Sequence, residues 1–82
     1  MNQINVSYPE TLAFSLKMQN YEFEREIKTA SLVKFYELGK VSSGFAADIL
    51  GISRIAFLDR LAAYGVSAYA DADELEADIV NA

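Results

Sequence analysis

Apolar and polar positions alternate at the start of the chain and recur at helical spacing over most of the remainder. Ile4, Val6 and Tyr8 are separated by single polar residues, a period of two that predicts a short β-strand. The proline in Pro9–Thr11 ends this strand, and the tripeptide favours a first helical turn. Because a lone strand leaves its backbone groups unpaired, it needs a partner. A second copy of the same strand, across a twofold axis, would serve, and so would Val66–Tyr69.

A central helix is predicted from Tyr21 to about Leu38, with Asn20 as N-cap and Gly39 as the C-terminal stop. Its apolar residues cover more than one face, which indicates burial on more than one side. One stripe comprises Ile27, Ala30, Phe35 and Leu38, and a second group comprises Leu32, Val33 and Tyr36. We expect one side to pack against the rest of the chain and the second group to form a dimer interface. A central helix wrapped by its own chain is the alternative.

The segment Ser42–Gly65 has the pattern of a helix-turn-helix. Ala47 is small where two helices must approach closely, and Gly51 allows a positive backbone φ at the turn. Ser53 is then placed to cap the second helix. The expected inner face of that helix consists of Phe57, Leu58, Leu61 and Tyr64. The fold class is therefore mainly α, with a short N-terminal strand, a central helix, a helix-turn-helix and a C-terminal tail.

The net charge of −5 is concentrated in this tail. Residues 1–70 contain seven basic and seven acidic residues, whereas residues 71–82 contain five acids and no base. We therefore divide the chain into a domain, residues 1–69, and an acidic tail, residues 70–82. The tail is either a solvated end or a segment that binds a partner protein. The expected partner-binding residues are Tyr69, Leu75, Ile79 and Val80.

The composition argues for a binding protein and against an enzyme. Cysteine and histidine are both absent, which excludes disulfides, thiolate or imidazole metal sites and the usual general base. The D-A-D-E-L-E run beginning at Asp71 lacks the glycine and the ligand spacing of a calcium loop. No cofactor or metal is expected. The chain has neither a signal peptide pattern nor a membrane-spanning run of apolar residues, so we expect a cytoplasmic protein.

A helix-turn-helix raises the question of DNA binding, and the candidates are Lys40, Ser53, Arg54 and Arg60. The outward positions of the second helix are Ile55, Ala56, Asp59, Ala62 and Ala63. These residues are poor readers of base edges, and the aspartate has the wrong sign for phosphate. One subunit is therefore expected to bind DNA weakly, and a dimer would bind better because each contact is doubled.

The order of segments also resembles a known family. The central helix contains A-S-L-V-K-F-Y-E-L-G-K-V-S, the next segment is A-A-D-I-L-G-I-S-R-I-A-F-L-D-R-L-A-A-Y-G-V, and the end is D-A-D-E-L-E-A-D-I. From about Val6 to Ile79 the chain resembles the UPF family numbered 0175, a group of small prokaryotic proteins. The resemblance implies a dimeric helix-turn-helix antitoxin that inhibits a PIN-domain-like ribonuclease toxin and represses its own operon.

Two other interpretations stay open beside the antitoxin. One is a DNA-binding transcriptional regulator that acts alone, and the other is a small dimeric helical scaffold without a role in nucleic-acid binding. For the antitoxin we expect the tail to contact a basic rim of the toxin that normally holds RNA, because a PIN-type active site is itself acidic and would repel the tail.

Overall fold

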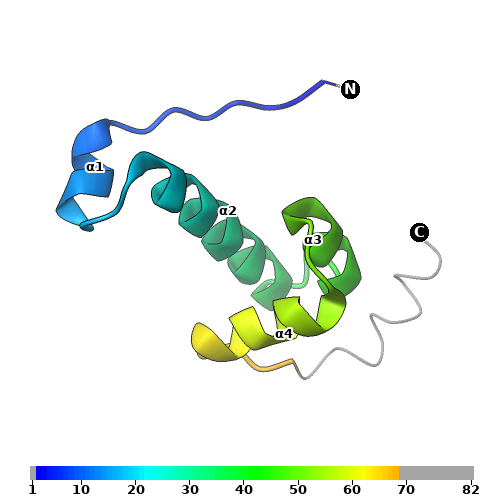
Figure 1. The fold of residues 1–82 in the computed structure, drawn as a ribbon. Helices are drawn as coiled ribbons and strands as arrows, with labels where there is room; N and C mark the ends of the chain where they lie inside the picture. Colours follow the sequence, from blue (N-terminus) through cyan, green and yellow to red (C-terminus); the bar gives the residue numbers. More distant parts are fainter. Residues whose placement is uncertain (1, 69–82) are drawn as a thin grey trace.

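A computed structural model describes residues 2–68, and these residues contain four helices. They are α1 (Glu10–Ser15), α2 (Asn20–Glu37), α3 (Ser43–Leu50) and α4 (Arg54–Ala63). Figure 1 shows α2 as the long axis of the molecule, with α1 beside its beginning and α3 and α4 against its C-terminal half. None of the four helices is long and apolar enough to cross a membrane.

The start of α2 is fixed by local hydrogen bonds. The backbone N–H of Gln19 donates to Glu22 Oε1 at 2.8 Å, as part of a reciprocal capping box. Asn20, predicted as the N-cap, is instead the first helical residue, and its Nδ2 donates to Glu10 Oε2 on α1 at 3.0 Å. Together with the buried Ala13 of α1, this bond places α1 against the first turns of α2.

The core lies where α2 crosses α3 and α4. Tyr36 meets Phe57 of α4 edge-on, with ring centroids 6.0 Å apart and planes at 75°. The buried members of this core are Leu32, Val33, Tyr36, Ala46, Ala47, Phe57 and Leu61. The placement of Leu32, Val33 and Tyr36 at a dimer interface is therefore corrected, because the chain's own helix-turn-helix covers them.

The other apolar stripe of α2 is not covered by the core. Phe35 and Leu38 are exposed and Ile27 is half-buried. The two faces of α2 are thus reversed relative to the simplest expectation: the group assigned to a partner faces inward, and the stripe beside it faces solvent. Periodicity separates the faces of a helix but does not say which one the rest of the chain covers.

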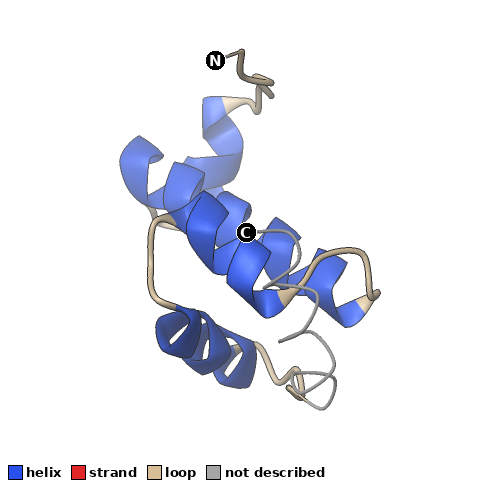
Figure 2. Cartoon of the chain, turned by 90° about the vertical axis from the view of Figure 1, so that its right-hand side faces the viewer, coloured by secondary structure: helices blue, strands red, loops and turns tan. Residues whose placement is uncertain are grey.

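Residues 2–9, which we call the N-terminal arm, run extended and do not form the predicted strand. Figure 2 shows helices and loops only among residues 2–68. Pairing with Val66–Tyr69 is not seen in the described residues 66–68, because Val66 and Ala68 pack against the helical core. Without a second strand beside it, the arm leaves Ile4 93 % exposed and Val6 71 % exposed.

Candidate functional site on the helix-turn-helix

The two helices of the motif are defined by one serine each and by one glycine. Ser42 accepts a hydrogen bond on its hydroxyl from the backbone N–H of Phe45 at 3.1 Å, which caps α3. Ser53 accepts one from the N–H of Ala56 at 3.1 Å, which caps α4. Between the helices Gly51 has φ of +71°, the left-handed conformation that glycine adopts without strain. The predicted turn chemistry is therefore present in the structure.

Arg54 connects the two helices of the motif. Its Nε donates to the hydroxyl of Ser43 at 2.8 Å, and that serine is completely buried at the start of α3. Arg54 as a whole is half-buried. Arg54 was predicted to contact DNA, but in this structure its side chain joins α3 to α4. Ser53, predicted for the same role, uses its hydroxyl as the cap of α4.

The remaining predicted DNA contacts, Lys40 and Arg60, are exposed. Lys40 lies in the connection between α2 and α3. Arg60 is six residues beyond Arg54, which places the two side chains about 120° apart around α4. Ser53 and Arg54 are therefore neighbours at the start of α4, whereas Arg60 lies on another side of this helix and Lys40 lies before α3.

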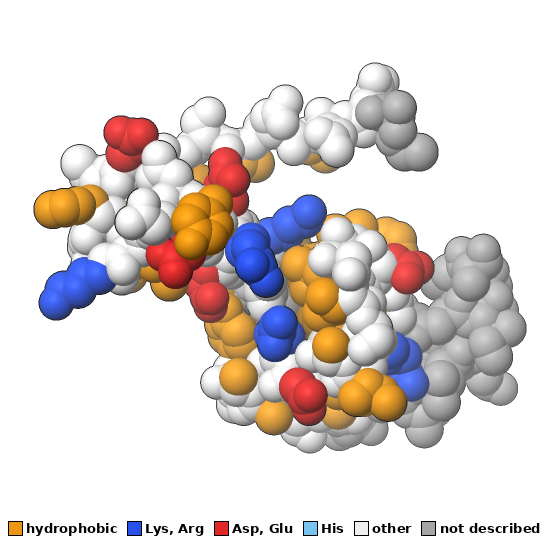
Figure 3. Space-filling model, viewed as in Figure 1, with side chains coloured by type: hydrophobic (Ala, Val, Ile, Leu, Met, Phe, Trp, Pro, Cys, Tyr) orange, Lys and Arg blue, Asp and Glu red, His pale blue; other side chains and the backbone are white. Residues whose placement is uncertain are grey.

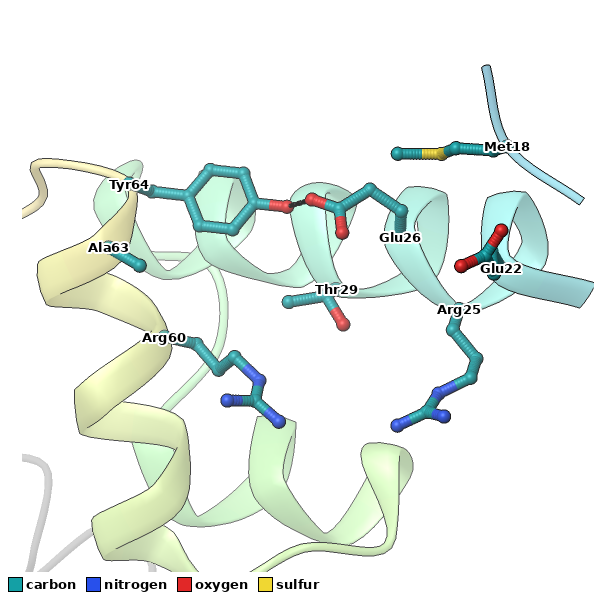
Figure 4. A pocket seen from close by; sticks show the side chains of 8 residues that line it. All are labelled: Met18, Glu22, Arg25, Glu26, Thr29, Arg60, Ala63 and Tyr64. Carbon is teal, nitrogen blue, oxygen red and sulfur yellow. Dashed lines mark hydrogen bonds between the residues drawn. The ribbon is translucent and has the colours of Figure 1, made fainter. Parts of the chain in front are cut away.

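Arg60 instead shares a hollow with residues of α2 (Figure 4). The hollow has a volume of about 420 Å³. The side chains of Arg25 and Arg60 extend into it from different helices, as Figure 4 shows. Two guanidinium groups at one hollow suit a phosphate or a carboxylate, although two glutamates at the same hollow balance their charge. Its lining consists of Met18, Glu22, Arg25, Glu26, Thr29, Arg60, Ala63 and Tyr64.

One contact closes an end of this hollow. The hydroxyl of Tyr64 donates to Glu26 Oε2. Burial and this hydrogen bond to a carboxylate raise the pKa of Tyr64 to about 12 from its ordinary 10.0. The bond ties the end of α4 to the first half of α2.

Sequence reasoning missed Arg25 and Thr29 as neighbours of Arg60. The two residues are four apart on α2 and so share a face, which the sequence does indicate. Which helix that face meets depends on how α2 crosses α4, and no local pattern specifies this angle. In Figure 3 several Lys and Arg side chains gather where α2 approaches α3 and α4.

The outer face of α4 has a different chemistry from these basic side chains. Ile55 is 72 % exposed, and Asp59 and Ala62 are also exposed. A surface that reads DNA presents hydrogen-bond donors to base edges and cations to phosphates. This face presents an apolar group and a carboxylate.

Two further predictions concern metals and the tail. Within residues 2–68 the structure contains no cluster of three or more acidic residues that could hold a metal ion. The predicted partner-binding residues Tyr69, Leu75, Ile79 and Val80 lie outside the described residues.

Comparison with known proteins identifies a family. The sequence profile described as "Uncharacterised protein family (UPF0175)" matches residues 1–82. The chain belongs to this family, as its resemblance in sequence predicted. No curated protein and no solved structure matches the chain.

Proposed function

We propose that this member of the family is a homodimeric antitoxin that binds and inhibits a PIN-domain-like ribonuclease toxin, and that it is a binding protein and not an enzyme. The observation that carries the proposal is the outer face of α4. Its exposed Ile55 and Asp59 suit contact with another protein better than contact with a polyanion. The family resemblance supports the toxin as the partner.

The acidic tail is the proposed site of toxin binding. Residues 71–82 contain five acids and no base, and apolar residues recur among them at helical spacing. Such a segment can place apolar anchors on a partner while its carboxylates face basic groups. The basic groups in question are those at the toxin's RNA-binding rim, so that occupation of this rim excludes the substrate.

The proposal is tested with the protein encoded by the neighbouring gene, where that protein is a PIN-domain-like nuclease. We expect deletion of residues 71–82 to weaken binding by at least about a hundredfold and to restore RNA cleavage by the toxin. Within the full chain, changing Leu75, Ile79 and Val80 together to serine is expected to reproduce most of this loss. The matched control changes Ala72 and Ala77 to serine and is expected to bind as the unaltered chain does.

Binding and inhibition that survive the deletion would refute the tail as the toxin-binding segment. A chain that neither binds nor inhibits the neighbouring nuclease in any form would refute the antitoxin proposal itself. Isothermal calorimetry measures the first property and cleavage of a labelled RNA measures the second.

Repression of its own operon is a second function that one observation favours. The two caps and the left-handed turn residue Gly51 produce the compact α3–turn–α4 unit that DNA-binding proteins use. Arg60 of α4 and Lys40, which precedes α3, are the exposed cations among the four predicted DNA contacts. Binding through them is electrostatic, and its affinity falls steeply as the salt concentration rises.

Arg60→Ala tests this second function better than Arg54→Ala, because loss of the Arg54–Ser43 hydrogen bond also disturbs the packing of α3 on α4. We expect Arg60→Ala to lower the slope of log affinity against log salt by about 1 per subunit for the DNA upstream of the gene. Lys17→Ala, which changes a cation in the α1–α2 connection, is the control and should leave the slope unchanged. An equal slope in both variants would exclude contact through Arg60.

A further inference from the structure

We propose that the N-terminal arm is a dimerisation strand. The arms of two copies pair antiparallel across a twofold axis, and their shared apolar face covers the groove between each arm and α2. The inference rests on the homodimer of the proposed function, but it is independent of toxin and DNA binding and it names the surface that forms the dimer.

The backbone of the arm is available for pairing with another strand. Residues 2–8 are extended and make no hydrogen bond with any other described residue. Proteins that expose a strand edge protect it with charged residues, bulges or a covering segment. The sequence Asn2–Tyr8 contains no charged residue. An extended, uncharged and unprotected edge is suited to pairing with another strand.

An apolar groove lies beside the arm. It has a volume of about 690 Å³ and lies between the arm and α2. In Figure 3 the arm lies apart from the helices, and apolar side chains lie on the side of the arm that faces the gap between them. Within residues 2–68 one ring contact bridges the groove, and it joins Tyr8 to Phe23 with centroids 5.2 Å apart. The apolar residues that line the groove are Ile4, Val6, Tyr8, Pro9, Ala13, Phe23, Ile27 and Phe35.

Charged residues of both signs line the groove. They are Glu10, whose carboxylate accepts a hydrogen bond from Asn20, and Glu24 and Lys28, which lie one helical turn apart on α2. Neither Glu24 nor Lys28 forms an ion pair within the described residues. Because a twofold axis reverses the direction of the second copy, Glu24 of one copy can face Lys28 of the other. The arrangement fits a second copy of this chain, which supplies both signs of charge.

The sequence pattern gives the register of the pairing. If Val6 of one arm lies opposite Val6 of the other, Ile4 faces Tyr8 in both directions. Ile4, Val6 and Tyr8 then lie on one face of the two-stranded ribbon, and Gln3, Asn5 and Ser7 lie on the other. An intrachain partner for the arm is disfavoured, because Val66 and Ala68 already pack against the helical core.

The exposed area is a large part of what a dimer requires. Ile4, Val6 and Tyr8 of the arm, with Phe35 of α2, are between 45 % and 93 % exposed. Together they present on the order of 500 Å² of surface, compared with about 800 Å² per partner in a standard interface. Backbone pairing and the remaining groove residues supply the difference.

Sedimentation velocity of the full chain tests the proposal. We expect a dimer at micromolar concentration, and we expect Val6→Asp to raise the dimer dissociation constant by at least about a hundredfold. Ser7→Asp, which adds the same charge to the polar face of the ribbon, is the matched control and is expected to change the constant by less than about tenfold. Val6 is absent from the buried core, so circular dichroism should show an unchanged helix content in both variants.

Cysteine crosslinking tests the register, because the chain has no native cysteine. With Val6 opposite Val6, the two Cα atoms are about 4.5–5.5 Å apart, within the range for a disulfide. Val6→Cys is therefore expected to form a covalent dimer on mild oxidation. Asn2→Cys is not, because antiparallel pairing separates the two copies of residue 2 by about 26 Å.

Three results would overturn the proposal. A monomer at 100 μM would also refute the homodimer of the proposed function. A dimer that Val6→Asp leaves intact would show that another surface forms it, with the homodimer retained. Crosslinking of Asn2→Cys together with Val6→Cys would indicate parallel pairing, and crosslinking of Asn2→Cys alone would indicate another register; either result would refute antiparallel pairing about Val6.

Discussion

The helix-turn-helix and the N-terminal region, which comprises the N-terminal arm and α1, differ in how far they bury their apolar side chains. Both contain phenylalanines on short segments, but Phe57 of α4 is 0 % exposed, whereas Phe14 of α1 is 85 % exposed. The first residue is enclosed by α2, α3 and α4, and the second extends from a helix of only six residues. The helix-turn-helix has completed its core within the chain, and the N-terminal region has not.

The difference shows where partners are needed. A chain of this size buries only about 60–65 % of the surface that its unfolded state exposes, so a self-contained core in one region leaves apolar residues over in another. Here most of them remain on the N-terminal arm, on α1 and on α2, and fewer, among them Ile55, remain on the helix-turn-helix. We infer that folding depends on the α2–α3–α4 core and that dimerisation depends on the other end.

The largest expected effect comes from truncating the two phenylalanines. Phe57→Ala removes a fully buried ring and is expected to cost about 3–5 kcal/mol of the free energy of unfolding. This cost is comparable to the whole stability of so small a domain, so the variant should be largely unfolded at 25 °C. Phe14→Ala should change the free energy of unfolding by less than about 0.5 kcal/mol. Urea denaturation followed by circular dichroism measures both.

Equal losses in the two variants would place Phe14 in the folding core and would contradict the difference between the two regions. A loss in Phe14→Ala that appears only at high protein concentration would support the difference. In that case the exposed ring contributes through association, and stability becomes dependent on protein concentration.

The helix-turn-helix could be predicted because its signals are local. Ser42, Gly51 and Ser53 each act on neighbours within a few residues, and each has the predicted role in the structure. The end of α2 at Gly39, with φ of +76°, follows from the same kind of signal. Capping and left-handed turns depend on the residue type and its immediate backbone, so one sequence suffices to find them.

The candidate site could not be predicted in this way, and the predicted N-terminal strand is not formed within residues 2–68, because both depend on tertiary packing. Leu32, Val33 and Tyr36 were assigned to a partner although α3 and α4 cover them. Arg25 and Arg60 meet at one hollow because α2 crosses α4. The alternation of Ile4, Val6 and Tyr8 indicates a strand, but a strand exists only with a neighbour to pair with.

A smaller effect is expected at two left-handed backbone positions, one in each region. Gly51 has φ of +71° and Lys17 has φ of +60°. Gly51→Ala meets no atom within 4 Å, so its expected cost of about 1–2 kcal/mol is backbone strain alone. Lys17→Gly relieves such strain but adds freedom to the unfolded chain, and a net change below about 1 kcal/mol is expected. Thermal denaturation of both variants measures the difference, and a stabilised Gly51→Ala would contradict the left-handed turn.

The smallest expected effect is a dependence of the free energy of unfolding on pH, caused by the hydrogen bond that joins the end of α4 to α2. Tyr64, at the end of α4, donates to Glu26 in the first half of α2, and its pKa is raised to about 12 from 10.0. Because the folded state holds this proton more tightly than the unfolded state, the resulting stability is complete below pH 10. It is lost as the pH rises from 10 to 12.

The measurement compares the unaltered chain with Tyr64→Phe by urea denaturation at pH 8, 10 and 11. Other tyrosines and lysines titrate in the same range, so the difference between the two proteins isolates Tyr64. We expect the stability of Tyr64→Phe to decline less steeply above pH 10, and the gap between the two proteins to narrow. Parallel declines would show that the Tyr64–Glu26 bond does not persist in solution, and that α4 is held to α2 by the apolar core alone.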